Sequence, residues 1–227
     1  MPDTRSNESV LSENLSLDKL EIVDVGSGAG DLVRYMTTQG AQVTGLECGA
    51  LQLEKARSYP LAGDEIYIEG VGQEMPFADA SFDVVIFFNS LHHVPGEHME
   101  RALDEASRVV KQAGTVYVAE PIASGSGFEL HAPIDDETSV RDAAYDTIRN
   151  ATARGFTQVR EIFYQTVYHY RDFAAFKEDM IRIEPRRRDL FAAIETDLNE
   201  VFDRLGVAEA SGMRFEQPMR VNLLKKA

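Results

Sequence analysis

The most constraining feature of this chain is a regular alternation of two patterns between residues 20 and 121. Short apolar runs, typical of buried strands, alternate with segments in which apolar residues recur at helical spacing. The predicted strands cover residues 20–26, 41–47, 64–71, 81–89 and 115–121. The predicted helices cover residues 31–40, 50–59 and 98–114. This alternation predicts an α/β fold of the Rossmann-like, doubly wound type, with parallel strands covered by helices on both faces.

The second half of the chain is less regular. We expect a helix at 138–153, a long strand at 157–170, a helical insertion at 172–206 and a final strand at 213–226. Pro218 interrupts the final strand, so we expect that strand to lie at a sheet edge or to contain a bulge. Together these elements predict one domain over residues 1–227, with a mostly parallel, seven-stranded sheet.

The two segments outside this sheet leave alternatives open. Residues 1–17 are polar and are expected to form a flexible N-terminal segment or one short helix. The second helix of the insertion carries an apolar stripe of Leu190, Phe191, Ile194, Leu198, Val201, Phe202 and Leu205. This stripe suits either a lid over the site or the surface of a homodimer.

Composition narrows the partners. The chain has 227 residues, and 38 acidic against 23 basic side chains give a net charge of −15. This sign of charge disfavours nucleic acids and anionic membranes as partners. No run approaches the roughly 20 apolar residues of a membrane span, and the N-terminus lacks the apolar segment of a signal peptide. We therefore expect a cytoplasmic protein without membrane insertion.

The single cysteine, Cys48, excludes an internal disulfide and a cysteine-based metal cluster. We expect it to be a small core side chain rather than a reactive thiol. The neighbouring acids Asp135, Asp136 and Glu137 are expected to cap a helix, since three consecutive residues at a helix start cannot all face one ion. No metal site is therefore predicted.

The stretch IVDVGSGAGDL places Gly26, Gly28 and Gly30 between a strand and a helix. A dinucleotide fingerprint would have its third glycine one residue later, where this chain has Asp31. A phosphate loop of the Walker type is also excluded, because no Lys-Ser/Thr pair follows. The turn is therefore predicted to hold a ligand without phosphates.

Two acids lie close to this turn in the predicted sheet. Asp24 precedes it on the first strand and could face a cationic amino group, or cap the backbone amides of the turn. Glu47 ends the second strand, where its carboxylate could accept both hydroxyls of a ribose or remain a solvated loop acid. An acid at this position also fits a nicotinamide cofactor, so Glu47 alone does not discriminate between ligands.

Four segments together resemble the class I S-adenosylmethionine-dependent methyltransferases, in the small-molecule branch that includes quinone and sterol methyltransferases. The segments are VDVGSGAGDL, GLE, GVGQEMPFADASFDVVIFFNSLHHV and LDEASRVVKQAGTVYVAEP. They span about residues 20–121, half of the chain. The remainder fits the family only in the order of its elements, which implies a final strand that runs antiparallel.

The resemblance implies S-adenosylmethionine as cofactor, with S-adenosylhomocysteine as product. The implied cofactor-binding residues are Asp24, Gly26, Ser27, Gly28, Gly30, Glu47, Cys48, Gly72, Gln73 and Asn89. Many family members carry an acid two residues before Gln73 that contacts adenine, whereas this chain has Val71. Adenine is then expected to rely on the backbone around Gly72 and Gln73 or on the Gln73 side chain.

The resulting hypothesis is an enzyme that transfers a methyl group from S-adenosylmethionine to a small molecule. The loop NSLHHVP replaces the Asn/Asp-Pro-Pro-aromatic loop of enzymes that methylate amines in polymers, so such substrates are disfavoured. Two alternatives remain. One is an NAD(P)-dependent oxidoreductase, disfavoured by Asp31; the other is a non-catalytic S-adenosylmethionine-binding protein.

The candidate catalytic residues are His92, His93 and Glu120. All three follow predicted strands at the carboxyl edge of the sheet, where the methyl group would be presented. Adjacent histidines are expected to point in different directions, so at most one would face the substrate as a base. The alternative is that both histidines only orient their loop through hydrogen bonds to the backbone.

Overall fold

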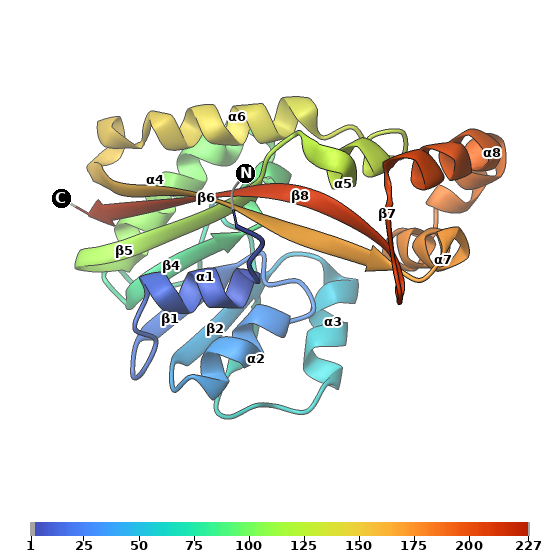
Figure 1. Cartoon of the computed structure of the whole chain (residues 1–227). Coiled ribbons are helices and arrows are strands. Elements are labelled where there is room, and N and C mark those ends of the chain that lie inside the picture. Colours follow the sequence, from blue (N-terminus) through green and yellow to red (C-terminus); the bar gives the residue numbers. More distant parts are fainter. Residues whose placement is uncertain (1–2, 227) are drawn as a thin grey trace. The chain divides into compact units, whose positions relative to one another are not determined.

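The computed structural model describes residues 3–226 (Figure 1). The chain divides into two compact units, and each is described by itself. The sheet unit comprises Ser6–Glu120, Val140–Phe163 and Arg220–Ala227, and the helical unit comprises Met1–Arg5, Pro121–Ser139 and Tyr164–Met219. Within the described residues, every helix is too short or too polar to cross a lipid bilayer. The interpretation of residues 1–227 as one domain stays a prediction.

The sheet unit is built on seven strands in the order β3-β2-β1-β4-β5-β8-β6. Their bounds are β1 (Glu21–Val25), β2 (Gln42–Glu47), β3 (Ile66–Glu69), β4 (Phe82–Phe88), β5 (Val110–Pro121), β6 (Phe156–Tyr170) and β8 (Gly212–Lys226). The first five strands pair in parallel. The arrow of β8 points opposite to that of β4 in Figure 1, so the last strand is antiparallel. The predicted fold class is thus confirmed.

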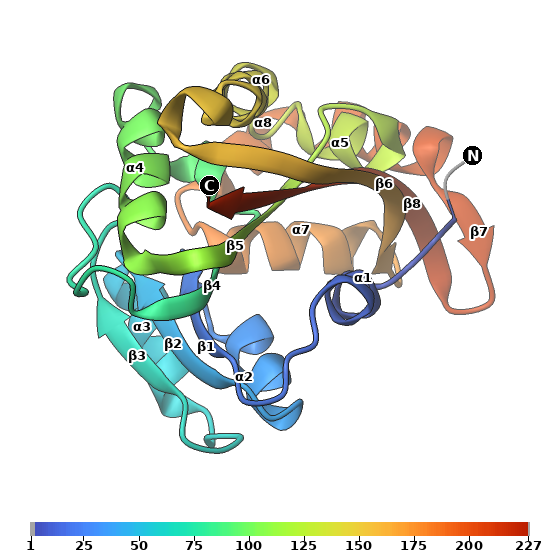
Figure 2. The ribbon, with the colours of Figure 1, turned by 90° about the vertical axis from the view of Figure 1, so that its left-hand side faces the viewer.

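Helices cover both faces of this sheet. They are α1 (Asn7–Asn14), α2 (Asp31–Thr38), α3 (Ala50–Ser58), α4 (Met99–Val109) and α6 (Thr138–Arg149), with 3₁₀ turns η1 (Leu91–His93), η2 (Gly96–His98) and η3 (Ala151–Arg154). Figures 1 and 2 both show α4 and α6 on one side of the sheet and α1 and α2 on the other. The carboxyl ends of β1, β2 and β4 therefore lie at one edge between two helical layers.

The core of the sheet unit follows from the apolar spacing along α4. Ala102, Leu103, Ala106 and Val109 recur at helical spacing and are fully buried. They pack against apolar side chains of the parallel strands, namely Val23, Val25, Val85, Phe87, Val116 and Val118. Each such aliphatic or aromatic side chain contributes about 1.5–3 kcal/mol when it leaves water. This packing anchors the strands whose ends carry the candidate site.

The helical unit contains α5 (Gly125–His131), α7 (Phe173–Ile183), α8 (Arg187–Leu205) and the short strand β7 (Val207–Glu209). Asp172 begins α7 by accepting a hydrogen bond from Ala175 N at 2.8 Å. The helical insertion at 172–206 was thus predicted with the right secondary structure. The strand β7 was not predicted; it pairs antiparallel with β8 and brings the described sheet to eight strands.

The apolar stripe of α8 has a partner inside its own unit. Phe191, Leu198 and Phe202 are at most 2% exposed. They pack with Leu130, Phe176, Met180 and Phe215 in one cluster. A lid and a dimer surface both stay predictions, but the stripe no longer supports either of them, because its buried side chains offer no exposed apolar face.

Two expectations about local structure need correction. The strand β8 lies between β5 and β6, so the edge position, one of the two alternatives for Pro218, was wrong, and the bulge stays a prediction. Pro218 lacks an N–H, and the Gln217 side chain makes up for it by donating to Ile122 O at 2.8 Å. The helix expected at 138–153 ends at Arg149 and is followed by the 3₁₀ turn η3.

The N-terminal segment adopts the helix that was one of its two alternatives. Ser6 Oγ accepts a hydrogen bond from Ser9 N at 3.1 Å and thereby caps α1. Val10 and Leu11 of this helix are fully buried. The helix α1 therefore belongs to the packed part of the sheet unit.

Candidate functional site

The glycine turn after β1 has a backbone that side chains rarely adopt. Gly26, Gly28 and Gly30 have φ angles of 74°, 55° and 82°, in the left-handed region that favours glycine. A Cβ on Gly26 would lie 2.6 Å from Ser90 Cβ, and one on Gly30 would lie 2.5 Å from the Tyr67 hydroxyl. A Cβ on Gly28 would meet nothing within 4 Å. The turn is thus tightly packed at both ends and open at Gly28.

Glu47 ties the glycine turn to the end of β2. Its Oε2 accepts a hydrogen bond from Gly28 N at 2.7 Å, and its Oε1 accepts one from Gly49 N at 2.6 Å. The side chain is only 8% exposed. Glu47 is therefore no solvated loop acid. Each carboxylate oxygen keeps a second lone pair, so the predicted contact with two ribose hydroxyls stays a prediction that this geometry permits.

Asp24 is buried beside the turn without a hydrogen-bond donor for one of its oxygens. Among residues 3–226, no group donates to Asp24 Oδ1. The amides of Gly26 and Gly28 instead donate to Leu46 O and Glu47 Oε2, so Asp24 does not cap them. Burial and the nearby negative charge of Glu47 raise the pKa of Asp24 to about 7.

A cavity of about 240 Å³ lies between the glycine turn, the start of α2 and the end of β4. Three buried polar atoms of its lining have no partner among the described residues: Asp24 Oδ1, Ser27 Oγ and Asn89 Oδ1. An unmet buried polar atom costs about 1–3 kcal/mol. Asn89 Oδ1 can only accept hydrogen bonds, Asp24 Oδ1 can only accept them when the carboxylate is ionised, and the Ser27 hydroxyl can also accept. This set of acceptors suits a ligand ammonium group, which carries three donors.

The end of β4 is fixed in an uncommon conformation on one side of this cavity. Asn89 has φ 51°, and its amide donates to Ala119 O at 2.8 Å. The next residue, Ser90, donates its hydroxyl to Val25 O at 2.6 Å. These bonds join β4 to both neighbouring strands, and they hold the Asn89 side chain at the cavity.

The first turn of α1 completes the cavity, which the sequence did not predict. Asn7 and Glu8 line it opposite the glycine turn. Nothing in their local sequence distinguishes them from other polar residues of the N-terminal segment. Their role follows only from the packing of α1 on the sheet.

Five predicted cofactor-binding residues do not line this cavity, namely Gly30, Glu47, Cys48, Gly72 and Gln73. Gly72 packs against the core, where an added Cβ would lie 3.0 Å from Val25 Cγ1. Gln73 is half-buried in the turn that Glu74 N closes on Val71 O at 3.2 Å. The contacts of Gly72, Gln73 and Cys48 with a cofactor stay predictions.

Cys48 is exposed, so its placement in the core was wrong. The reason is that β2 ends at Glu47, which leaves the next residue in the loop before α3. Desolvation and the charge of Glu47 raise the pKa of the Cys48 thiol. The thiol is therefore protonated at neutral pH and is a poor nucleophile.

His92 and Glu120 form a buried pair where β4 and β5 end. Glu120 Oε1 accepts a hydrogen bond from Leu91 N at 2.9 Å, and its Oε2 contacts His92 Nδ1. Glu120 is 1% exposed and His92 is 4% exposed. A carboxylate at Nδ1 favours the tautomer whose Nε2 is unprotonated and can accept a proton. Glu120 thus both orients His92 and holds the backbone of its turn.

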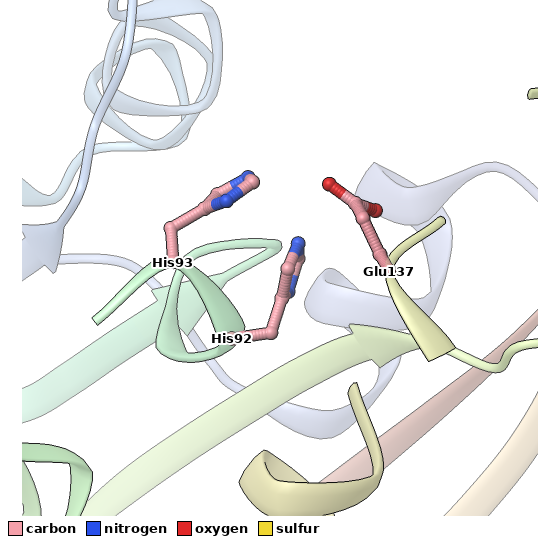
Figure 3. Close-up of side chains that lie close together, drawn as sticks. All are labelled: His92, His93 and Glu137. Atoms are coloured by element: carbon pink, nitrogen blue, oxygen red, sulfur yellow. The ribbon is translucent and has the colours of Figure 1, made fainter. Parts of the chain in front are cut away.

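His93 is exposed, but its ring lies against that of His92. The two ring centroids are 4.0 Å apart, with planes inclined by 46°. Figure 3 shows both side chains on the turn after β4; Glu137, also drawn there, belongs to the helical unit. The rings therefore do not diverge as expected, and Glu120 contacts the ring of His92.

Comparison with known proteins identifies the part of the chain that carries this site. Residues 23–118 match the family described as methyltransferase domain. The chain is 33% identical over 119 residues to 27-O-demethylrifamycin SV methyltransferase of Amycolatopsis mediterranei. The aligned residues cover 49% of this chain and 43% of that protein. The chain is 34% identical over 110 residues to ubiquinone biosynthesis O-methyltransferase of Stutzerimonas stutzeri, covering 47% of each. The chain thus spans less than half the length of these curated relatives.

Solved structures extend the likeness of fold to the whole chain. The YcgJ protein of Bacillus subtilis aligns with a TM-score of 0.68 over 96% of this chain and 97% of its own, at 18% identity. At this identity the likeness shows the fold alone. Residues 23–118 are thus similar in sequence to a methyltransferase domain, and the chain shares its fold with the YcgJ protein.

Proposed function

We propose that this protein transfers a methyl group from S-adenosylmethionine to a small-molecule acceptor. The observation that carries the proposal is the cavity beside the glycine turn, with unmet acceptor atoms on Asp24, Ser27 and Asn89. A ligand that ends in an ammonium group meets those acceptors, and its positive charge favours the ionised form of Asp24. Phosphates have no such match, because the acid Asp31 lines the same cavity.

The remaining cofactor contacts extend along the carboxyl edge. Glu47 would accept the ribose hydroxyls with the lone pairs that Gly28 N and Gly49 N leave unused. The turn at Gly72 and Gln73 would face adenine. When bound, the cofactor supplies an activated methyl group on a sulfonium. The protein residues then align the acceptor and exclude water, which are the main contributions expected for an in-line transfer.

His92 is the candidate base for an acceptor that must lose a proton. Its Nδ1 is held by Glu120, so Nε2 can take a proton from a hydroxyl or an acidic carbon. Such general base catalysis is typically worth about 10²–10⁴-fold. An amine or thiolate acceptor would not need this step, and the enzyme would then work by alignment alone.

The acceptor class rests on charge and on relatives. A net charge of −15 disfavours nucleic acids, and the two relatives named above are a 27-O-demethylrifamycin SV methyltransferase and a ubiquinone biosynthesis O-methyltransferase. A small organic acceptor fits both observations. We also propose a cytoplasmic location, supported by the single cysteine, and keep the homodimer as a further proposal.

Calorimetry tests the proposed function without knowledge of the acceptor. The protein should bind S-adenosylhomocysteine and not NADH. The Asp24→Asn variant should lose affinity by at least about tenfold, since it lacks the charge that pairs with the ammonium. Asp64→Asn, at an exposed loop position, should bind as the wild type does. Binding of NADH without binding of S-adenosylhomocysteine would overturn the proposal.

A turnover assay separates an enzyme from a binding protein. S-adenosylhomocysteine formation is followed with a panel of phenols, carboxylic acids, amines and thiols as acceptors. Acceptor-dependent formation supports the methyltransferase. Tight cofactor binding with no turnover on any member of the panel would favour the non-catalytic alternative.

A further inference from the structure

The sheet unit contains a buried arginine whose charge has no ion pair. Arg220 on β8 is 7% exposed, and among the described residues no group accepts a hydrogen bond from its Nε. Its guanidinium carbon lies 3.2 Å from the centroid of the Tyr145 ring on α6. A guanidinium stays charged in proteins, and a buried charge without a partner is costly. This position therefore calls for a physical reason.

The register of β5 and β8 places Arg220 across from Glu120. Ile122 N donates to Pro218 O at 2.9 Å. In an antiparallel pair, this bond makes Ile122 and Pro218 partners, so Glu120 and Arg220 are partners two residues along. Side chains of such partners project from the same face of the sheet. The buried arginine thus lies next to the carboxylate that holds His92.

The charges around Arg220 are mostly carboxylates. Burial lowers the pKa of Arg220, whereas Tyr145, Glu161, Glu120 and Asp142 act in the opposite direction. Glu161 and Asp142 are exposed, so water also solvates them, but Glu120 is 1% exposed. Glu120 is therefore the neighbour that depends most on a nearby cation.

Each oxygen of Glu120 has a partner other than Arg220. Oε1 accepts from Leu91 N, and Oε2 contacts His92 Nδ1. A row of three groups results, from the turn after β4 through β5 to β8. Its outer members are an imidazole and a guanidinium, and its centre is a buried carboxylate.

Such a carboxylate beside a neutral imidazole carries a negative charge that burial disfavours. A nearby fixed cation lowers the cost of keeping such a carboxylate charged, and Arg220 supplies that cation from the neighbouring strand.

We propose that Arg220 is a positioning residue that keeps Glu120 ionised beside a neutral His92, so that His92 retains an unprotonated Nε2. The inference rests on the proposed function in one respect: a neutral His92 matters to catalysis only if it accepts a proton in that reaction. The other charged or titratable groups of the sheet unit near this row are His93, Tyr145, Glu161 and Asp142.

Nitrogen-15 NMR of the histidine rings tests the proposal without an acceptor. Ring nitrogens are followed from pH 5 to 9, and His92 is assigned by comparison with His92→Gln. In Arg220→Gln, His92 should take up its second proton at a pH at least about one unit higher than in the wild type, a tenfold change in proton affinity. Arg220→Lys should restore most of the wild-type midpoint, because it keeps the charge.

Matched variants separate charge from structure. Arg149→Gln removes an exposed arginine of α6 and should leave the His92 titration unchanged. The proposal is overturned if a folded Arg220→Gln titrates like the wild type, or if Arg220→Lys shifts the midpoint as far as Arg220→Gln does.

A stability cycle covers the case in which Arg220→Gln does not fold. Removing both charges leaves no uncompensated carboxylate, so Glu120→Gln/Arg220→Gln should unfold at a higher denaturant concentration than Arg220→Gln. If Glu161→Gln restores the stability of Arg220→Gln and Glu120→Gln does not, Arg220 compensates the charge of Glu161 and not that of Glu120. This result would overturn the proposal. Equal instability of the single and double variants would overturn it as well.

Calorimetry with S-adenosylhomocysteine distinguishes failure of the Arg220 proposal from failure of the proposed function. Arg220 is not part of the cavity that contains Asp24, so its variants should bind S-adenosylhomocysteine like the wild type. If the wild type does not bind it, the proposed function fails while the histidine titration still decides the role of Arg220.

Discussion

The glycine-turn cavity and the His92–Glu120 pair lie at the same edge of the sheet, yet they meet their hydrogen-bonding needs in different ways. In the cavity, Asp24, Ser27 and Asn89 each have a buried atom without a partner among the described residues. At the pair, both oxygens of Glu120 are engaged by protein groups. The first region is arranged for a ligand that supplies donors, and the second is oriented by the protein itself. This contrast predicts that removing the buried charge of Asp24 alters ligand binding and stability in opposite directions.

The largest effect is expected from removing the buried charge of Asp24. Its pKa is about 7 in the folded protein, against an ordinary value of 3.8. The ionised carboxylate therefore destabilises the fold. This destabilisation is absent below pH 3.8, grows between pH 3.8 and 7, and is complete above pH 7. Asp24→Asn should raise the free energy of unfolding by up to about 4 kcal/mol at pH 8. Urea unfolding at pH 4 and pH 8 measures this difference.

The same variant should bind S-adenosylhomocysteine less tightly, which is the opposite direction. If the Asp24 carboxylate stabilised the fold instead, its removal would lower both the free energy of unfolding and the affinity for S-adenosylhomocysteine. If Asp24→Asn destabilises the protein at pH 8, the carboxylate has a partner that the structure does not show, and the contrast between the two regions fails.

The next effect compares two glycines of the same turn. Gly30→Ala places a methyl group within 2.5–2.7 Å of the Tyr67 ring at a φ of 82°, so we expect a loss of about 3 kcal/mol in stability. Gly28→Ala meets no neighbour and should cost only about 1 kcal/mol for its backbone angle. Denaturant unfolding of the two variants measures the difference directly.

Gly28→Ala sharpens the comparison further, because its methyl group would occupy the space left for a ligand. Affinity for S-adenosylhomocysteine should fall more than stability does. Unchanged affinity in this variant would mean that the ligand does not approach the turn at Gly28.

Glu47→Ala should weaken cofactor binding by roughly 2–3 kcal/mol, or about 30- to 150-fold, through loss of a charge-assisted pair of hydrogen bonds. It should also destabilise the protein, because Gly28 N and Gly49 N lose their acceptor. Glu47→Gln keeps one acceptor oxygen, so its cofactor affinity and its stability should lie between those of the wild type and those of Glu47→Ala. Calorimetry and unfolding of the same samples separate the two effects; unaltered affinity would place the ribose elsewhere.

The smallest effect is expected at Cys48. Its side chain is exposed, so Cys48→Ser should change the free energy of unfolding by no more than about 0.5 kcal/mol. Cofactor affinity should stay within about twofold. A larger loss of affinity would restore Cys48 as a cofactor contact, as the family resemblance implies.

The alternation of strands and helices and the glycine turn could be predicted because both are local patterns. The spacing along α4 sets its buried face, and three glycines in five residues fit a turn with positive φ angles. The core placement of Cys48 failed because strand ends are set by pairing with neighbours, not by the apolar run. The edge placement of Pro218 failed because the neighbouring Gln217 side chain donates to Ile122 O, far away in the sequence, and so replaces the missing donor.

The rest of the candidate site depends on contacts between residues far apart in the chain. Glu8 reaches the cavity from α1, and Arg220 lies across from Glu120 a hundred positions earlier. The sequence around each of these residues resembles many solvated or structural positions. The packing of α1 on the sheet brings Glu8 to the cavity, and the order of strands brings Arg220 to the edge where His92 lies.

Proton release on ligand binding tests the central claim most directly, namely that Asp24 receives the ammonium end of the cofactor. At pH 6.5 a carboxyl with a pKa of about 7 is mostly protonated and must ionise to pair with a cation, so about 0.8 proton should leave per bound molecule. Calorimetry of S-adenosylhomocysteine in buffers of different ionisation enthalpy counts these protons. The account predicts this release in the wild type and none in Asp24→Asn. Equal release by both proteins, or no binding to the wild type, would contradict it.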